Sequence, residues 1–195
     1  MSSREAILAA VKENRPPATQ LPSLDQDWIT FENKTEHFLE MLTAVGGRGE
    51  VIAAGDVNTR IGQIVEELQS REICSLEPNF EGNLELESIE SPKQLETLDL
   101  AIIPCPFGVA ENAAIWLTAG ILKERAVLFI AQHLIFTLPE SEILHNMHEA
   151  YARLSLGEPE FGVFVSGPSK TADIEQSLVI GAHGARSLTV LVTRD

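Results

Sequence analysis

Hydrophobic and polar residues follow each other along this chain in a pattern that predicts alternating strands and helices. Apolar residues at helical spacing predict a helix over about 32–45, and the apolar run at 50–54 predicts a buried strand that leads into a helix capped by Asp56. Further strands are predicted at 98–103, 113–118, 125–130, 161–165 and 187–192, and further helices at 139–154 and 171–179. Because strands that alternate with helices favour a parallel sheet, we predict an α/β domain with a mostly parallel sheet flanked by helices.

The first 27 residues are predicted to form a separate N-terminal arm. Ser2 and Glu5 have the spacing of a capping box, and the apolar stripe behind them predicts a short helix. The prolines at 16–17 end this helix, because proline breaks the backbone hydrogen bonding of a helix interior. We therefore divide the chain into an N-terminal helix with a proline-containing arm, residues 1–27, and a single α/β domain, residues 28–195.

Composition and charge narrow the classes of partner. The chain has 195 residues, of which 44% are hydrophobic and 22% charged, a mixture typical of a globular protein. It carries 29 acidic and 14 basic side chains, and the net charge of −15 disfavours binding to nucleic acid or to an anionic membrane surface. The acidic stretch at 77–96 is predicted to be a solvated, irregular connection. No apolar run is long enough to span a bilayer and the first residues do not resemble a signal peptide, so we expect a cytoplasmic protein without membrane insertion.

The residue types present argue against a metal or redox cofactor. The two cysteines, Cys74 and Cys105, are fewer than the four thiolates that hold an iron–sulfur cluster, and Cys105 is predicted to be a small buried residue. His145 and His148 do not have the spacing of a zinc-protease motif, so we interpret them as part of an exposed helical face. His133, between two apolar runs, fits either a core histidine or a site residue. We predict no metal site and no cofactor bound by this chain.

Candidate chemistry is densest between residues 166 and 175, where the chain leaves a predicted strand through a Gly-Pro turn and enters a predicted helix. The first backbone N–H groups of a helix attract an anionic group, and the hydroxyl groups and the lysine in this segment add donors and charge. The same residues are typical of a plain helix cap and turn, and the pattern alone leaves both interpretations open. The candidate ligand-binding residues here are Ser166, Gly167, Ser169, Lys170, Thr171 and Asp173.

A second candidate segment contains His183, which lies between Gly181 and Gly184 and three residues before Arg186. Glycines in this position allow the backbone to approach a ligand closely. The imidazole can protonate or orient an anionic substrate, although a hydrogen-bonded turn histidine explains the spacing equally well. His183 is therefore a candidate catalytic residue, and Gly184 and Arg186 are candidate ligand-binding residues.

A third candidate segment follows the strand predicted at 98–103. Residues just past a buried strand often contact ligands in open α/β sheets, and Gly108, Glu111 and Asn112 lie in this position. Glu111 can act as a general base or as a covalent nucleophile, or it is a loop carboxylate paired with a basic side chain. We name Glu111 as a candidate catalytic residue, and Gly108 and Asn112 as candidate ligand-binding residues.

These segments resemble a known family of proteins. The chain reads Ser-Gly-Pro-Ser-Lys-Thr-Ala-Asp-Ile-Glu at 166–175 and Gly-Ala-His-Gly at 181–184. Both strings resemble the lactate utilization protein C family, whose members are also described as LutC-like, YkgG or DUF162 proteins. The Gly-Val-Ala-Glu string at 108–111 is similar to a further segment of that family. The chain departs from the family pattern at Asn112 and Ala113, where Thr-Gly is usual, and at Ala185, where proline is frequent.

The resemblance implies a fold similar to the sugar-phosphate isomerase and CoA-transferase (NagB/RpiA-like) superfamily. It also implies participation in the oxidation of L-lactate to pyruvate, together with two iron–sulfur partner proteins. Because this chain has only two cysteines, iron–sulfur clusters are expected only in the partners. We therefore predict a LutC-like component with a pocket for an anionic small molecule, in which Glu111 or His183 transfers a proton and Arg186 with the segment at 166–171 binds the anion.

Two other classes of function remain open. The segment Ala110-Glu111-Asn112 is similar to the glutamate-asparagine segment of CoA transferases, which continue with glycine where this chain has Ala113. This similarity indicates a stand-alone enzyme of the isomerase or acyl-transfer class. Alternatively, the acidic stretch at 77–96 fits a non-catalytic scaffold subunit that contacts a basic surface of a partner.

Overall fold

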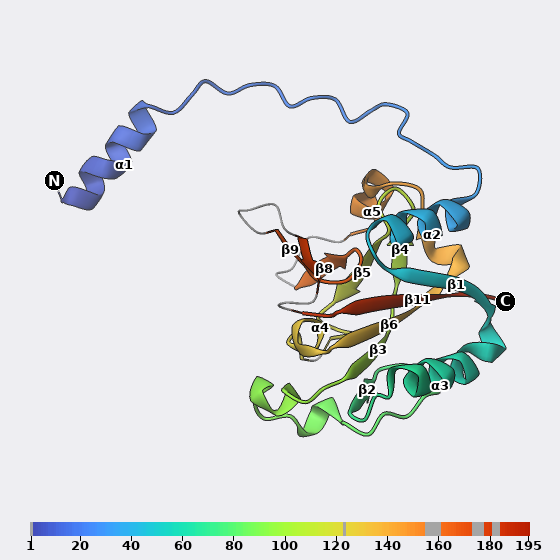
Figure 1. The fold of residues 1–195 in the computed structure, drawn as a ribbon. Coiled ribbons are helices and arrows are strands. Elements are labelled where there is room, and N and C mark those ends of the chain that lie inside the picture. Colours follow the sequence, from blue (N-terminus) through green and yellow to red (C-terminus); the bar gives the residue numbers. More distant parts are fainter. Residues whose placement is uncertain (1, 123, 155–160, 173–177, 181–183) are drawn as a thin grey trace.

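Five parallel strands form the central sheet of the protein, which is shown as a computed structural model in Figure 1. The structure describes residues 2–122, 124–154, 161–172, 178–180 and 184–195. The strands lie side by side in the order β1 (Arg48–Ala53), β11 (Ser187–Arg194), β6 (His133–Pro139), β3 (Leu100–Pro104) and β2 (Ile73–Ser75). Every neighbouring pair in this sheet is parallel, which confirms the predicted mostly parallel α/β architecture.

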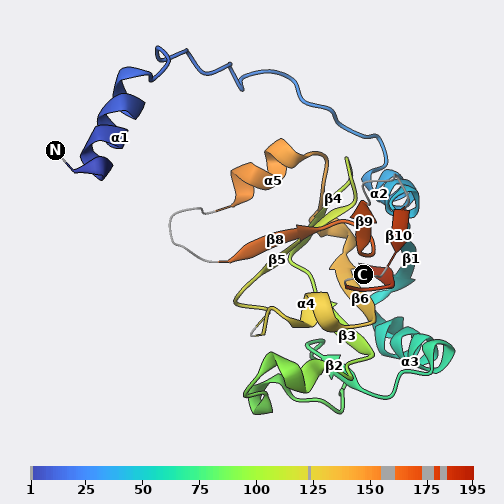
Figure 2. The ribbon, with the colours of Figure 1, turned by 60° about the vertical axis from the view of Figure 1, so that its left-hand side comes forward.

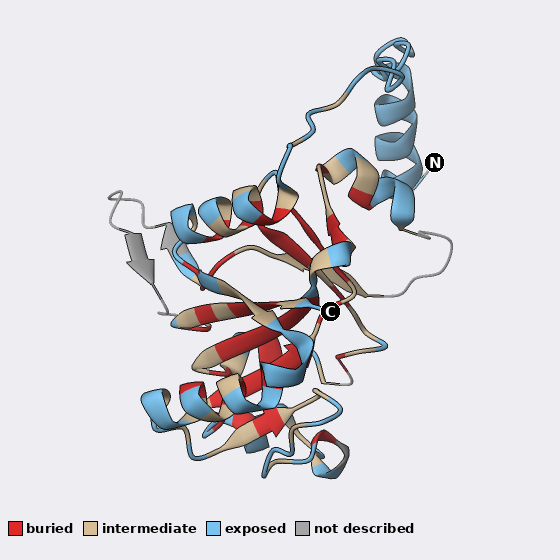
Figure 3. Cartoon of the chain, turned by 90° about the vertical axis from the view of Figure 1, so that its right-hand side faces the viewer, coloured by how far each residue is buried: buried red, intermediate tan, exposed pale blue. Residues whose placement is uncertain are grey.

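Both faces of the central sheet are buried, as parallel strands require. The two long helices of the domain are α2 (Lys34–Ala44) and α3 (Val57–Leu68). Successive strand residues point to opposite faces, so Ile102 of β3 shares a cluster with Ile61 of α3, whereas Ile103 shares another cluster with Phe38 of α2. Figure 3 shows the buried strands enclosed between these helices. The hydrophobic core therefore fixes both the layers and the strand register.

A second, mixed sheet packs against the same face of the central sheet as α2. Its strands lie in the order β7 (Ile143–Leu144), β4 (Phe107–Val109), β5 (Ala114–Thr118) and β8 (Gly162–Val165). Its outer face packs on the short helix α5 (Met147–Arg153), through a small cluster that includes Phe107 and Ala150. The sequence pattern predicted strands at 113–118 and 161–165 but not their assembly into a separate sheet.

The N-terminal arm is a helix carried on an extended segment. Helix α1 (Ser3–Glu13) stands away from the rest of the chain, and residues 2–27 are exposed throughout (Figures 1 and 2). The predicted capping box is present, because the Ser2 N–H donates to Glu5 Oε2 (2.7 Å) and the Glu5 N–H donates to Ser2 Oγ (3.3 Å). No helix in the described part of the chain combines the length and the apolar character needed to cross a bilayer.

The acidic stretch at 77–96 is largely irregular, as predicted, and holds two 3-10 turns, Leu86–Ser88 and Pro92–Leu95. The leucines Leu86 and Leu95 are buried in the core, so this connection is anchored rather than fully solvated. Helix α3 starts directly after the 3-10 turn Ala54–Asp56, but the Asp56 side chain makes no capping hydrogen bond, contrary to the prediction.

Two predicted elements in the middle of the chain are wrong. The strand predicted at 125–130 is the short helix α4 (Val127–Ile130). The helix predicted at 139–154 is helical only in α5, because the chain first completes β6, forms a 3-10 turn (Glu140–Glu142) and adds β7 to the second sheet. Ile143 and Met147 fit helical spacing by coincidence, since Ile143 pairs with Gly108 of β4.

The helix predicted at 171–179 is also wrong within the described residues. Strands β9 (Lys170–Ala172) and β10 (Leu178–Ile180) pair antiparallel there. The β-branched residues at 171, 179 and 180 favour extended backbone over helix. The segment 166–170 therefore does not lead into a helix, and the positive helix end that was expected to attract an anion is not available at this point.

Candidate functional site

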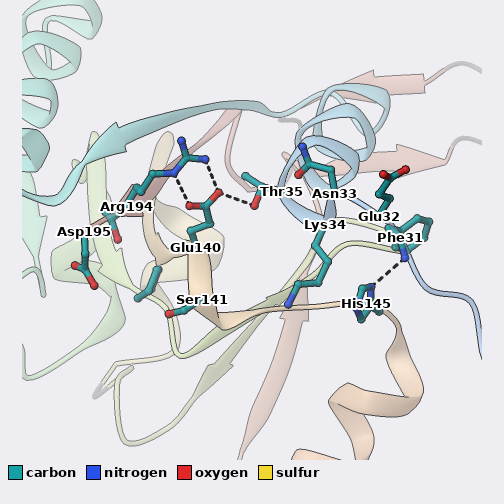
Figure 4. Close-up of a pocket in the computed structure, with 12 residues that line it drawn as sticks. Phe31, Glu32, Asn33, Lys34, Thr35, Glu140, Ser141, His145, Arg194 and Asp195 are labelled. Atoms are coloured by element: carbon teal, nitrogen blue, oxygen red, sulfur yellow. Dashed lines mark hydrogen bonds and ion pairs between the residues drawn. The ribbon is translucent and has the colours of Figure 1, made fainter.

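A cavity of about 910 Å³ opens at the carboxyl edge of the central sheet (Figure 4). Its walls are the start of α2 (residues 31–35), the turn after β6 (139–141), His145 after β7, and the end of β11 (193–195). Strands β6 and β11 are neighbours, with Thr193 paired to Pro139, so the residues that follow them lie side by side. Because open α/β sheets bind ligands outside the carboxyl ends of their strands, this cavity is the candidate functional site.

A charge-paired group forms one wall of the cavity. The Arg194 guanidinium donates to both carboxylate oxygens of Glu140, from Nε (2.6 Å) and from Nη2 (2.6 Å), and Thr35 Oγ1 donates to Glu140 Oε1 (2.9 Å). The hydrogen bonds from Arg194, together with that from Thr35, lower the pKa of Glu140 from 4.5 to about 2. Glu140 and Arg194 therefore compensate each other's charge at neutral pH.

Lys34 brings a positive charge into the cavity. Its half-buried side chain extends from the first turn of α2, and Figure 4 shows its ammonium group between Ser141 and His145. Within the part of the chain that the structure describes, this ammonium has no hydrogen-bond or ion-pair partner. A cation held between protein walls without a counterion favours an anionic ligand, and the positive end of α2 adds to this field.

His145 contributes a defined hydrogen-bond donor. Its Nδ1 accepts the backbone N–H of Phe31 (3.0 Å), so the neutral ring carries its proton on Nε2. The His145 backbone N–H donates to Glu149 Oε2 (2.8 Å), and this hydrogen bond holds His145 at the N-terminus of α5. With the Lys34 ammonium and the Ser141 hydroxyl, the cavity thus has one cation and two neutral donors that can bind a small carboxylate bearing a further polar oxygen. The acidic residues Glu32 and Asp195 also line the cavity.

Among the residues that the structure describes, no three His, Cys, Asp or Glu side chains lie close enough to hold a metal ion. Cys105 is buried, and its Sγ donates to the Ile103 carbonyl oxygen (3.4 Å). Burial raises the pKa of the Cys105 thiol well above its ordinary value, which suits the predicted role as a core residue. His148 is exposed and stacks on Trp28 with ring centroids 3.3 Å apart, whereas His145 is half-buried and precedes the helix.

Glu111 lies directly behind the cavity wall formed by His145. Its backbone N–H donates to the His145 carbonyl oxygen (3.1 Å), and its exposed carboxylate accepts the Met147 N–H (2.9 Å) at the start of α5. The next residue, Asn112, accepts the Ala114 N–H with its side chain (3.0 Å) and the Ser166 hydroxyl with its carbonyl oxygen (2.7 Å). The structure therefore brings Asn112 into contact with Ser166, whereas the Glu111 carboxylate binds the start of α5.

The glycine-containing segments at 166–169 and 184–186 also meet, at the amino edge of the central sheet. The Ser169 N–H donates to the Ala185 carbonyl oxygen (2.9 Å), and a Cβ placed on Gly184 lies 3.0 Å from Ser169 Cβ. Gly167 has φ +77°, and a Cβ there lies 2.6 Å from the Val45 carbonyl oxygen. These glycines allow segments of the protein to approach each other closely.

The remaining predicted residues are spread over several elements. Gly108 is buried in β4, where a Cβ lies 2.8 Å from Leu138 Cδ2, and Lys170 is exposed in β9, which also contains Thr171. Arg186 is exposed before β11, and its N–H donates to the Gln132 carbonyl oxygen (2.8 Å). Asp173 and His183 lie outside the described residues, so their predicted roles stay predictions.

His133 lies near Arg186 at the first position of β6. Its Nδ1 is 2.8 Å from Ser187 Oγ across the parallel pair of β6 and β11. Partial burial and the nearby positive charge of Arg186 lower the pKa of His133, although Asp99 opposes this effect. The neutral imidazole therefore belongs to a packed polar cluster at the amino edge.

Sequence reasoning missed the cavity residues Lys34, Thr35, Glu140 and Arg194. Glu140 and Ser141 were placed inside a predicted helix, which hid their position just after a strand. Treating the apolar run at 134–138 as a strand would have put Glu140 and Arg194 at the carboxyl ends of two strands. That position is the signal that could have found them.

Comparison with known proteins identifies similar sequences. A family model described as the LUD domain matches residues 79–193, more than half of the chain. Proteins named lactate utilization protein C from Shouchella clausii and Halalkalibacterium halodurans are 33% identical over 114 residues and 32% identical over 109 residues. These matches cover 56% and 53% of this chain, and 50% and 47% of the two relatives. The chain thus spans about half the length of these relatives.

Two further matches extend over more of the chain. An uncharacterized protein, YkgG, from Escherichia coli is 27% identical over 173 residues, which are 86% of this chain and 72% of that protein. The crystal structure of a DUF162 family protein from Deinococcus radiodurans has the same fold, with a TM-score of 0.60 at 18% identity over 83% of this chain and 96% of that one. The LUD match contains Glu140, Ser141 and His145, whereas Lys34 lies before it and Arg194 directly after it.

Proposed function

The chain belongs to the LUD domain family, and from this premise we propose that it serves lactate utilization. The specific role is that of a LutC-like component in a system that oxidises L-lactate to pyruvate with iron–sulfur partner proteins. The sequence similarity to proteins named lactate utilization protein C supports this role. Cys74 and Cys105 are both buried, and two thiolates do not suffice for a cluster, so electron transfer takes place in the partners.

The contribution of this chain is to bind a small carboxylate in the cavity at the carboxyl edge. One observation carries this assignment: the half-buried Lys34 ammonium has no partner among the described residues, while Arg194 in the same cavity is neutralised by Glu140. A carboxylate gives Lys34 its counterion, and Ser141 and the His145 Nε2–H can donate to a second oxygen such as the hydroxyl of L-lactate or the keto group of pyruvate. Both molecules therefore fit the donor set.

Binding by titration calorimetry tests the cavity. L-lactate and pyruvate are titrated into the full chain, into Lys34→Ala and into Lys93→Ala, a control at an exposed lysine outside the cavity, on the 3-10 turn Pro92–Leu95. Because a hydrogen bond to a charged group contributes about 1.5–3 kcal/mol, Lys34→Ala is expected to weaken binding about tenfold or more. Equal binding by both lysine variants would contradict the cavity as the anion site.

Growth on L-lactate tests the cellular role separately. A strain that lacks the corresponding gene is complemented with the wild-type chain, with Lys34→Ala, or with Ser169→Ala combined with His183→Ala. Loss of growth with Lys34→Ala alone assigns the function to the carboxyl edge, whereas loss with the double variant alone assigns it to the segments first predicted from the sequence. Growth without any copy of the chain would reject the role in lactate utilization.

A further inference from the structure

Helix α1 presents an apolar stripe that nothing in the described chain covers. Ile7, Leu8 and Val11 lie on one side of the helix and are 64%, 50% and 65% exposed, and no residue of α1 is buried. The arm continues with Leu21 and Leu24, which are also exposed. Most of the large hydrophobic side chains that are exposed in the described residues therefore lie on this arm.

The helix has the local signals to form but no tertiary contacts to hold it. Besides the capping box at Ser2, the Asn14 side chain donates to the Ala10 carbonyl oxygen (2.9 Å) at the other end. An isolated helix shorter than about 12–15 residues is marginally stable in water, and most helices in proteins are stabilised by packing of their apolar face. The 11 residues of α1 thus need a surface that buries Ile7, Leu8 and Val11.

The protein carries a groove of matching chemistry. A cavity of about 850 Å³ lies between residues 24–28 and helix α5. Its apolar lining comes from Leu24, Trp28, Tyr151 and Ala152, and the acidic residues Asp27 and Glu149 also line it. The two walls of the groove are held together, because Trp28 stacks on His148 and the Asn146 side chain donates to the Ile29 carbonyl oxygen (2.8 Å).

Charge also matches the arm to this groove. Residues 1–24 carry one more basic than acidic side chain, with Arg4, Lys12 and Arg15 against Glu5 and Glu13. A total of −15 therefore leaves −16 on residues 25–195. The net charge of the arm is therefore opposite in sign to that of the rest of the chain, and the groove itself is lined by Asp27 and Glu149, so electrostatic attraction favours docking of the arm.

We propose that α1 of one copy docks into the α5 groove of a second copy, so that two chains exchange their arms. The link between α1 and the groove contains Pro16, Pro17 and Pro22, which favour an extended, semi-rigid chain and oppose folding back onto the same copy. Exchange between two copies repeats one contact by symmetry and buries both stripes. This proposal does not depend on the proposed role in lactate utilization.

Mass measurement in solution is the first test, by light scattering coupled to size exclusion. The wild-type chain is expected at twice 21.3 kDa, Ile7→Gln with Val11→Gln at 21.3 kDa, and the control Ala6→Gln with Ala9→Gln, on the opposite face of α1, at twice 21.3 kDa. Because no residue of α1 is buried in the domain, circular dichroism and thermal unfolding are expected to show a folded domain in every variant. A wild-type monomer, or a stripe variant that stays dimeric, overturns the proposal.

Disulfide trapping identifies the acceptor surface and the donor chain. Val11→Cys combined with Ala152→Cys is expected to give a covalent dimer on a non-reducing gel, whereas the control pair of Ala9→Cys with Ala152→Cys gives little. The native Cys74 and Cys105 are buried and do not compete for the engineered thiols. A disulfide formed within one chain, which leaves a covalent monomer, overturns the exchange, and so does failure of both pairs to cross-link.

Discussion

The two edges of the central sheet differ in whether their polar groups are paired within the protein. At the amino edge, the segments at 166–169 and 184–186 form hydrogen bonds with each other and with neighbouring parts of the protein. Examples are the contacts from Ser169 to Ala185 and from Ser166 to Asn112. At the carboxyl edge, the Lys34 ammonium faces a cavity of about 910 Å³ without a partner among the described residues. The polar segments that stand out in the sequence therefore lie at the amino edge, whereas the unpaired Lys34 ammonium lies at the carboxyl edge.

This difference shows that a glycine can be needed either for close packing within the protein or for binding a ligand, and a local sequence pattern cannot distinguish the two. Glycine is required wherever something approaches the backbone, whether that is a ligand or another part of the same chain. At Gly167 the approaching group is the Val45 carbonyl oxygen at the end of α2, so the structural requirement is already explained. An unpaired cation in a cavity has no such structural explanation and points to a ligand.

The largest expected effect comes from Gly167→Ala at the amino edge. A Cβ at this position meets the Val45 carbonyl oxygen at 2.6 Å, and the backbone has φ +77°. A left-handed residue other than glycine costs about 1–2 kcal/mol and overpacking costs about 1–3 kcal/mol, so the free energy of unfolding should fall by roughly 3 kcal/mol. Urea denaturation measures this loss.

Gly55→Ala is the matched control for that substitution, because a Cβ on Gly55 meets no atom within 4 Å. Its free energy of unfolding should equal or slightly exceed that of the wild type. If Gly167→Ala unfolded at the same urea concentration as Gly55→Ala, close packing would not explain the glycine motif, and a ligand-binding role for Gly167 would gain support.

An intermediate effect is expected from the charge pair at the carboxyl edge. Because the folded-state pKa of Glu140 is lowered to about 2 from 4.5, the ionised carboxylate adds stability that is fully present above about pH 4.5 and is lost as the pH falls toward 2. Arg194→Gln removes the main cause of the shift, so this acid-dependent loss should shrink. The uncompensated Glu140 charge should also weaken carboxylate binding at Lys34.

Urea midpoints measured from pH 7 down to pH 2 check the first consequence, and calorimetry with L-lactate checks the second. Arg153→Gln provides the control, since Arg153 forms a comparable ion pair with Glu142 (2.6 Å) and does not contact Glu140. An acid profile of Arg194→Gln that matches those of the wild type and the control would show that the pair does not set the ionisation of Glu140.

Sequence reasoning succeeded where a signal is local or strictly periodic. The capping box of α1 and the strand at 98–103 are examples, because adjacent residues and an uninterrupted apolar run specify them. It failed at β6, where Pro139 looked like the start of a helix and the residues of β7 and α5 continued a helical spacing. The apolar run at 134–138 fits a strand as well as a helix, and non-local pairing with β3 and β11 decides in favour of the strand.

The cavity was missed for a related reason. Thr35 and Glu140 are hydrogen-bonded but stand 105 residues apart, and Arg194 comes from a third segment. No motif of fixed spacing joins these residues, because the sheet topology alone brings them together. By contrast, the candidate residues at 166–170 and 184–186 are contiguous in the sequence, so a sequence motif could identify them. The structure brings these two segments into contact.

The smallest expected effect concerns His133 at the amino edge. Its pKa is lowered by partial burial and by Arg186, so the folded state resists a proton that the unfolded state binds near its ordinary value of 6.5. Stability should therefore fall slightly as the pH drops below 6.5, until His133 is protonated in the folded state as well. Arg186→Ala should raise the pKa of His133 and reduce this acid loss, whereas Arg186→Lys keeps the charge and should leave both nearly unchanged. Titration of the His133 ring by NMR distinguishes these outcomes. If Arg186→Ala titrated like the wild type, Arg186 would not act on His133, and its exposed guanidinium would be better explained by the ligand-binding role predicted from the sequence.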